Sequence, residues 1–368
     1  MTKQSKYLVT ILRSVVCGDG SPFPFEVDWD AIWKLARSNH LEAIVYSVAP
    51  EKLKKEMQAE FFNMIARSVR QENLLQQIEK ALSENGISYA LQKGSLLKYD
   101  YPEMSMRFMS DMDFYIKPEE RQIVKTLIES IGGAAAHTDS GDDSFAFFNQ
   151  LGVEFHGRLL YRRTDKGIEN YPDWSFVDES RNRLTEEGFA LNLIGHAVGD
   201  LFKGGPGIRY ILDLWVYRHR HSPQPDWDFV FNRLKQDGIY KPAENLLNLS
   251  EYLFGEGEET ELMKEMAEYI LGGGLYGSSK RATASEAART GGGVKAVLHQ
   301  VFRNRTEYEN RYPWLKKYPA LLPAAWVLRI SKTLKVHKGA VKSWMKRMKN
   351  VDKADVEKQK EMLRKFGV

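Results

Sequence analysis

The chain has 368 residues, of which 43% are hydrophobic and 28% are charged. This length allows about two to three domains, and the composition is typical of a folded globular protein rather than a disordered, collagenous or disulfide-stabilised one. The single cysteine, Cys17, excludes an intramolecular disulfide and a cysteine-based zinc site, so we expect a reducing, cytoplasmic location.

No segment is typical of a secretory signal or a membrane span. The apolar stretch at residues 7–16 is short, is interrupted by Arg13 and lacks a small-residue cleavage site. No run approaches the roughly 18 apolar residues that a spanning helix needs.

The net charge of +4 is concentrated in the C-terminal tail. Residues 331–368 hold twelve Lys and Arg against four Asp and Glu, whereas residues 1–330 sum to −4. Because the basic character belongs to the tail, it does not indicate a nucleic-acid-binding surface over the whole protein.

The first 85 residues predict a helical region. Apolar residues recur at three- to six-residue steps from Leu53 to Leu82, which places one apolar stripe on a long helix. Gly86 is expected to end this helix, because glycine is favoured directly after the last helical residue.

Residues 86–184 predict a compact core with a small mixed sheet. Pro118 is expected to open a helix over residues 119–131, which Gly132 ends. Short runs typical of strands, separated by Gly-, Asp- and Ser-rich turns, occur at residues 87–91, 112–116, 134–137, 145–148 and 153–156.

The helical pattern returns after Thr185 and continues to the C-terminus. Residues 272–293 are rich in Gly, Ser, Ala and Thr and are interpreted as a linker. Further helices are predicted over residues 186–201, 208–219, 227–236, 242–254 and 258–271. We therefore expect an α+β fold in four parts: an N-terminal helical region (1–85), a mixed α/β core (86–184), a helical domain (185–330) and a basic C-terminal helical tail (331–368).

The residues able to perform chemistry lie in or near the predicted strands. Asp111 and Asp113 are two positions apart on one strand, so their side chains project from the same face. Neighbouring carboxylates repel each other unless a cation lies between them, and hard oxygen ligands suit Mg²⁺. Glu154 on a later strand would add a third, and three such acids can hold two metal ions about 4 Å apart. Gly94 and Ser95, at a strand-to-helix turn, could present N–H groups and a hydroxyl to phosphates.

The acidic pair alone is weak evidence, because about six pairs with this spacing are expected by chance in a chain this acidic. The simpler interpretation is two solvated acids on an edge strand. Asp113, however, lies between Met112 and Phe114, in a strand that a core would favour. An acid in that setting lowers stability unless a partner or ligand compensates.

The order of these motifs resembles the nucleotidyltransferase (DNA polymerase beta-like) superfamily. A more specific resemblance is to bacterial nucleotidyltransferases associated with polysaccharide-biosynthesis loci. It covers most of residues 30–330, with the basic tail outside it, and rests on residues 91–97, Tyr101, Pro102, Arg107, residues 110–114 and 153–156, His196, residues 207–209, Asp213 and residues 321–326.

The resemblance implies an NTP-using enzyme with Mg²⁺ or Mn²⁺, in which Asp111, Asp113 and Glu154 are catalytic and bind the metal. Gly94 and Ser95 would hold the triphosphate. The chain departs from the superfamily pattern in two respects: fifteen residues separate Ser95 from Asp111, and the third acid is glutamate. The longer gap is interpreted either as a substrate-facing loop or as a sign of a site that has lost catalysis.

Three residues near these acids are further candidates for nucleotide binding. Lys93 and Arg107 flank the expected phosphate site and could neutralise charge on departing pyrophosphate, or be ordinary surface cations. His156 shares a strand face with Glu154, so it could orient a substrate, act as a general base or be purely structural.

The predicted helical domain supplies the remaining candidates for nucleotide binding: His196, Arg209 and Asp213. Because Arg209 and Asp213 are four residues apart, they could instead form an intrahelical ion pair. Residues 204–207 (Gly-Gly-Pro-Gly) lack the Gly-Lys-Ser/Thr of a P-loop and are interpreted as a turn whose glycines could approach a nucleotide.

The tail predicts a basic helix with a loose apolar stripe formed by Ile330, Leu334, Val341, Met345 and Met348. A basic amphipathic helix can lie on an anionic membrane, bind an acidic partner or pack on its own protein.

Together these features predict Mg²⁺-dependent transfer of a nucleoside monophosphate from an NTP to a hydroxyl acceptor, with release of pyrophosphate. Glu154 or a metal-bound base would deprotonate the acceptor, which could be a sugar, a protein or a small molecule. Two other functions remain open: a non-catalytic nucleotide- or partner-binding module of the same fold, and a nucleic-acid-directed, toxin-like transferase that uses the basic tail.

Overall fold

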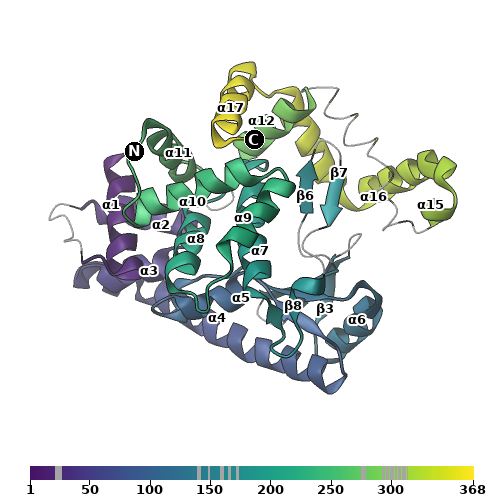
Figure 1. Ribbon diagram of the computed structural model, residues 1–368, viewed down its shortest axis with the longest axis horizontal. Helices are drawn as coiled ribbons and strands as arrows, with labels where there is room; N and C mark the ends of the chain where they lie inside the picture. Colours follow the sequence, from purple (N-terminus) through teal and green to yellow (C-terminus); the bar gives the residue numbers. More distant parts are fainter. Residues whose placement is uncertain are drawn as a thin grey trace.

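The structure is a computed structural model that describes most of the chain. The described residues are 1–20, 27–138, 142–147, 150–157, 161–164, 167–170, 174–274, 279–291, 314–368 and the single residues 295, 298, 302, 305, 308 and 312. A seven-stranded mixed sheet lies among helices, which confirms the predicted α+β class (Figure 1).

The N-terminal region is helical, as predicted. It comprises α1 (Lys3–Leu12), a π-helical segment η1 (Arg13–Cys17), α2 (Trp29–Asn39), α3 (Glu42–Val48) and the 34-residue α4 (Glu51–Glu84). Gly86 follows α4 with φ +68°, in the left-handed region that glycine adopts without strain, which explains why the helix ends there.

The main sheet has the order β3-β4-β5-β2-β1-β9-β8. Its strands are β1 (Tyr89–Leu91), β2 (Asp111–Ile116), β3 (Ala134–Thr138), β4 (Asp142–Phe147), β5 (Leu151–His156), β8 (Val177–Asp178) and β9 (Arg183–Leu184). The five predicted strands are confirmed, except that the predicted end at Phe148 lies outside the described residues. The turn predicted over residues 139–143 was wrong for its last two residues, because β4 begins at Asp142; residues 139–141 lie outside the described part. Strands β8 and β9 were not predicted, because each has only two residues, which is too few to show the alternation of apolar and polar residues that identifies a strand.

The two faces of the sheet pack against different helices. Phe114 and Phe155 belong to a hydrophobic cluster with side chains of α4 and of α6 (Arg121–Ser130), on one face. Ala90 and Tyr115, which alternate with them, belong to a larger cluster with the helical domain on the other face. Since side chains alternate along a strand, Asp111 and Asp113 project toward the helical domain.

The predicted helices of the helical domain are present. They are α7 (Glu186–Leu201), α8 (Ile208–Arg220), α9 (Trp227–Gln236), α10 (Tyr240–Phe254) and α11 (Glu261–Leu271). Helix α11 begins three residues later than predicted, because the Thr260 side chain accepts a hydrogen bond from the backbone N–H of Met263 and caps it. Between the strands lie α5 (Gly94–Leu97) and the 3₁₀ turns η2 (Lys98–Asp100), η3 (Met104–Met106), η4 (Pro118–Glu120) and η6 (Trp174–Phe176); a separate hairpin of β6 (Tyr161–Thr164) and β7 (Gly167–Asn170) was not predicted.

The C-terminal part contains α12 (Ser279–Thr290), α15 (Trp314–Lys317), η7 (Pro319–Leu321), α16 (Leu322–Lys349) and α17 (Lys353–Phe366). The interpretation of residues 272–293 as a linker was wrong for α12, which uses its alanines for close packing: Ala284 and Ala287 are buried. Residues 275–278 and 292–294 of that segment lie outside the described part. Helix α16 continues across position 331, where the tail was expected to begin. Among the described residues, no helix combines the length and apolar character needed to cross a bilayer.

Candidate active site

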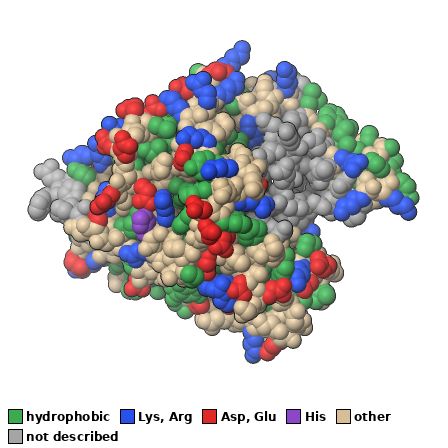
Figure 2. Space-filling model, viewed as in Figure 1, with side chains coloured by type: hydrophobic (Ala, Val, Ile, Leu, Met, Phe, Trp, Pro, Cys, Tyr) green, Lys and Arg blue, Asp and Glu red, His purple; other side chains and the backbone are tan. Residues whose placement is uncertain are grey.

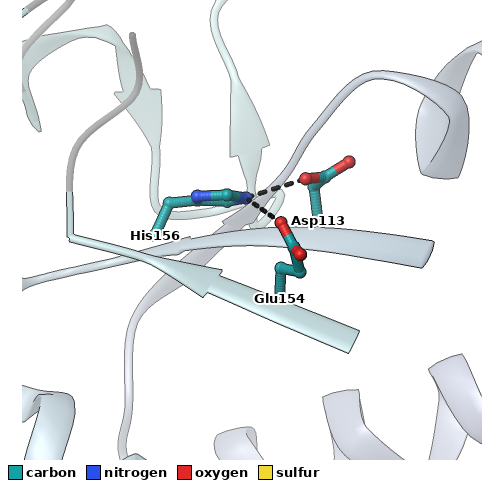
Figure 3. Close-up of side chains that lie close together, drawn as sticks. All are labelled: Asp113, Glu154 and His156. Carbon is teal, nitrogen blue, oxygen red and sulfur yellow. Dashed lines mark hydrogen bonds and ion pairs between the residues drawn. The ribbon is translucent and has the colours of Figure 1, made fainter. Parts of the chain in front are cut away.

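The pairing of β2 with β5 brings three metal-ligating side chains together. The two strands are parallel, and Asp113 lies directly opposite Glu154. His156, two residues further along β5, projects from the same face. One ligand atom from each of Asp113, Glu154 and His156 lies within 4.8 Å of the other two (Figure 3).

Asp113 is the centre of this cluster and is buried. Its Oδ1 lies 2.7 Å from Nε2 of His156 and 2.9 Å from Nζ of Lys93. Because an ionised carboxylate only accepts hydrogen bonds, His156 must donate from Nε2 in this arrangement. The same Nε2 lies 3.6 Å from Oε2 of Glu154, whose other oxygen accepts a 3.2 Å hydrogen bond from Ser144.

The surroundings hold Asp113 charged and disfavour charge on Glu154. Burial alone would raise the pKa of the Asp113 carboxyl, but the Lys93 ammonium and the His156 imidazole outweigh burial and hold the pKa well below its usual range. Burial raises the pKa of Glu154, and the neighbouring carboxylates of Asp111 and Asp113 raise it further. Glu154 is therefore the acid in this site that gains most from an added cation.

Asp111 lies at the start of β2 and lines the same cavity as Asp113 and Glu154. Its Oδ1 accepts a 2.8 Å hydrogen bond from Ser110. It does not belong to the 4.8 Å cluster found among the described residues. Asp111, Asp113 and Glu154 therefore line one cavity, as predicted, although Asp111 lies outside the 4.8 Å cluster. His156 belongs to that cluster but is not among the residues that line the cavity.

The turn between β1 and α5 is tightly constrained. Lys93 has φ 46° and ψ −122°, a combination that costs a residue with a side chain about 1–3 kcal/mol. A Cβ added to Gly94 would lie 2.9 Å from Cγ of Met109 and 3.3 Å from a guanidinium nitrogen of Arg107, so only glycine fits. Both Lys93 and Gly94 line the cavity, whereas Ser95 is buried and is not among its lining residues.

The cavity beside these residues has a volume of about 250 Å³ and lies between the sheet and the helical domain. Its helical wall is formed by side chains from α7, from α8 and from the turn that joins them: His196, Asp200, Lys203, Arg209 and Tyr210. Lys203 forms a 3.0 Å ion pair with Asp200. The wall thus places the positive charges of Lys203 and Arg209, and the negative charge of Asp200, on the other side of the cavity from the acids of the sheet.

His196 and Tyr210 form a flat aromatic pair on this wall. Their rings stack with centroids 5.3 Å apart and an interplanar angle of 22°. Burial, with a contribution from Lys93, lowers the pKa of His196 to about 4, so the imidazole is neutral at neutral pH. A neutral pair of rings can accept a planar ligand without an added charge.

Arg107 and Asp213 form a buried ion pair behind the cavity. Nε of Arg107 donates to Oδ1 of Asp213 at 2.7 Å, and the Tyr101 hydroxyl donates to the same oxygen at 2.6 Å. Arg107 lines the cavity but Asp213 does not. Arg209, the expected helical partner of Asp213, donates to the carbonyl of Phe108 at 2.9 Å.

Some residues of the site were not found from the sequence. Asp200, Lys203 and Tyr210 line the cavity without belonging to any motif, and only their proximity to the Gly-rich turn at residues 204–207 could have pointed to them. The glycines of that turn serve packing: a Cβ on Gly204 would lie 3.0 Å from the backbone of α12, and one on Gly205 would lie 2.6 Å from the Tyr269 ring.

The donor set fits a divalent cation. Two carboxylates and an imidazole are ligands for metals such as Mg²⁺, Mn²⁺ and Zn²⁺. Burial, together with the carboxylates of Asp111 and Asp113, raises the pKa of Glu154 despite the nearby Lys93 and His156. Asp113 and Glu154 would hold such an ion, together with Nε2 of His156 once this nitrogen has lost the proton that it donates to Asp113. Asp111 lines the same cavity as the two acids.

A family model described as an uncharacterised nucleotidyltransferase matches residues 26–255. This match covers more than half of the chain and every candidate site residue from Lys93 to Asp213. No curated protein and no solved structure gives a match.

Proposed function

Because the chain belongs to this nucleotidyltransferase family, we propose that it transfers a nucleoside monophosphate from an NTP to a hydroxyl acceptor. The observation that supports this most is the cluster of Asp113, Glu154 and His156, whose two acids line the same cavity as Lys93 and Gly94. A cation-binding group beside a constrained Lys-Gly turn provides the two elements that phosphoryl chemistry requires, charge neutralisation and positioning.

In the proposed reaction the acceptor oxygen attacks the α-phosphorus of the NTP, the bond from that phosphorus to the bridging oxygen breaks, and pyrophosphate leaves. A bound Mg²⁺ or Mn²⁺ would neutralise charge on the phosphates. Glu154 or a metal-bound base would take the acceptor proton.

Lys93, Arg107 and Arg209 would bind the phosphates, since all three line the cavity. Burial would lower the pKa of the Lys93 ammonium, but Asp113 outweighs it and keeps the pKa above its usual value, so Lys93 carries its charge at every physiological pH. The stacked rings of His196 and Tyr210 would lie against the base.

The test is transfer of label from each NTP, labelled at the α-phosphate, with Mg²⁺ or Mn²⁺ and with or without cell extract. We expect release of pyrophosphate by the native chain and a loss of about a thousandfold or more in Asp111→Ala with Asp113→Ala. Sugar hydroxyls are the first acceptors to test, because of the resemblance to polysaccharide-associated transferases.

The matched control replaces two exposed acids that lie on other elements, Asp30→Ala with Asp228→Ala. This variant should transfer label at the native rate. Equal label transfer by the native chain and by the Asp111 and Asp113 variant would exclude the proposed mechanism.

One observation favours a second function, nucleotide binding without turnover. Lys93 and His156 both contact Oδ1 of Asp113, so this carboxylate is already satisfied by protein groups. This function predicts that NTP with metal raises the midpoint of thermal unfolding while no pyrophosphate is released.

A further inference from the structure

An exposed apolar patch lies at the end of the molecule formed by α15, η7 and the start of α16. Figure 2 shows hydrophobic side chains gathered at this end, at the right of the view, with Lys and Arg beside them. The patch consists of Tyr318, Leu321, Val327 and Leu328, which are 51%, 48%, 65% and 50% exposed. Exposed apolar side chains that gather in one place, unlike scattered ones, indicate an interaction surface.

The patch is held in shape by a small core of its own. Leu315 and Ala325 are fully buried, together with Tyr308, and the half-buried rings of Trp314 and Trp326 pack against them. The exposed side chains of the patch therefore lie on the outer surface of a region that has a hydrophobic core of its own.

The segment that carries the patch, residues 314–351, has charged residues of one sign only. Residues 314–351 contain eight Lys, two Arg and no Asp or Glu. Lys316 and Lys317 adjoin the patch and are exposed, and exposed Lys342, Lys346 and Lys349 follow along α16. No carboxylate of the described residues lies within ion-pair distance of these five lysines.

We propose that this patch docks the protein on the surface of an anionic phospholipid bilayer. Apolar side chains that protrude from a convex corner can enter the boundary between headgroups and acyl chains, and each nearby lysine adds attraction to acidic headgroups. Tyr and Trp are the residues favoured at that depth. The surface lies outside the matched family region and does not depend on the proposed transferase activity.

Other occupants fit this surface less well. A second copy of the chain would bring two stretches with ten cations each against one another, which is repulsive. Nucleic acid would use the lysines but would leave the exposed Leu and Val side chains without a role. The anionic bilayer uses both the charge and the apolar groups.

The test is sedimentation of the full chain with vesicles of phosphatidylcholine, alone or mixed with phosphatidylglycerol. We expect binding to the mixed vesicles only, weakened by salt. Val327→Gln with Leu328→Gln should reduce partitioning about tenfold, as should Lys316→Gln with Lys317→Gln.

Matched controls replace equally exposed side chains on α4. Phe62→Gln with Val69→Gln and Lys52→Gln with Lys55→Gln should bind mixed vesicles as the native chain does, and all four variants should keep the native unfolding midpoint. Equal binding to neutral vesicles, equal binding by patch and control variants, or retention on an acidic protein or a nucleic acid without vesicle binding would each overturn the proposal.

Discussion

Gly94 is the residue whose size the site depends on most. Replacing it with alanine would place a Cβ 2.9 Å from Cγ of Met109 and 3.3 Å from Arg107, both of which line the same cavity. We expect Gly94→Ala to displace these side chains and to weaken NTP binding about tenfold or more, while the chain still folds. Nucleotide titration followed by calorimetry or by the shift in unfolding midpoint measures this loss.

Gly199, in the last turn of α7, is the matched control for that substitution. A Cβ there would meet no atom within 4 Å, and the residue has helical geometry. Gly199→Ala should leave nucleotide binding unchanged and stabilise the helix by up to about 1 kcal/mol. If both variants bind NTP equally well, the turn at Lys93 and Gly94 does not take part in binding.

For individual residues, the sequence predicted which acids belong to the site but not which side chains form hydrogen bonds with them. Strand alternation places Asp111 and Asp113 on one face and Glu154 and His156 on another strand, which needs no tertiary information. Contact between His156 and Asp113 depends on the parallel register of β2 and β5, and these strands are separated by about 40 residues. No local pattern encodes that register, so the hydrogen bond could not be predicted.

Arg107 and Asp213 connect the loop before β2 to helix α8. The two side chains are 4% and 3% exposed, so removing one leaves a buried charge without its partner. We expect Asp213→Ala to lower the free energy of unfolding by about 3–5 kcal/mol, and the apolar pair Arg107→Met with Asp213→Leu to lower it by less. Denaturant unfolding monitored by circular dichroism compares the two variants.

A surface ion pair provides the contrast. Lys360 and Glu357 on α17 are 47% and 71% exposed and lie 2.7 Å apart. Glu357→Gln should change the free energy of unfolding by no more than about 0.5 kcal/mol. An equally small effect of Asp213→Ala would mean that the buried pair does not support the connection to α8.

His221, directly after α8, connects three elements and should make their packing pH-dependent. Its Nδ1 lies 2.7 Å from Asp100 of η2, and its Nε2 lies 2.9 Å from Glu186 of α7. Burial alone would lower the pKa of His221, but hydrogen bonds to these two carboxylates raise it. A raised pKa means that the folded state binds the proton more tightly, so this stabilisation is complete at low pH and is lost as the pH rises through the folded-state pKa.

We expect His221→Gln to lower the free energy of unfolding by about 2 kcal/mol near pH 6 and by progressively less toward pH 9. Denaturant unfolding of both proteins across this range gives the difference at each pH. A difference that grew with pH would contradict the assigned sign.

Among the helices, those with a capping residue and a periodic apolar stripe were predicted with nearly correct bounds. A helix whose small residues pack only in the folded protein was not predicted. Helix α7 has the predicted bounds because Thr185 caps it and a buried apolar series follows. Helix α12 was read as a linker because alanine, serine and threonine carry no apolar stripe. The small side chains of α12 pack because α17 and the turn at Gly204 lie close against this helix, and these contacts cannot be seen in the local sequence.

At the scale of the whole molecule, the C-terminal helix packs on the rest of the protein, which is one of the alternatives that the sequence left open for the basic tail. Phe366 is fully buried in the main hydrophobic cluster of the helical domain, and Asn245 of α10 donates a 3.0 Å hydrogen bond to its carbonyl. The side-chain amide of Gln359 donates to the Tyr269 hydroxyl of α11 at 2.8 Å. Helix α17 therefore belongs to the fold, while the basic α15 and α16 extend the surface.

This arrangement predicts that a change at the last helix destabilises the whole domain. Phe366→Ala should lower the free energy of unfolding by about 3–5 kcal/mol, because it removes a fully buried aromatic side chain and leaves a cavity. Phe62→Ala, at a residue 56% exposed on α4, should change it by less than about 0.5 kcal/mol. Both values come from denaturant unfolding of the full chain. If the two variants were equally stable, α17 would be an appendage, and the helical wall of the cavity would not depend on it.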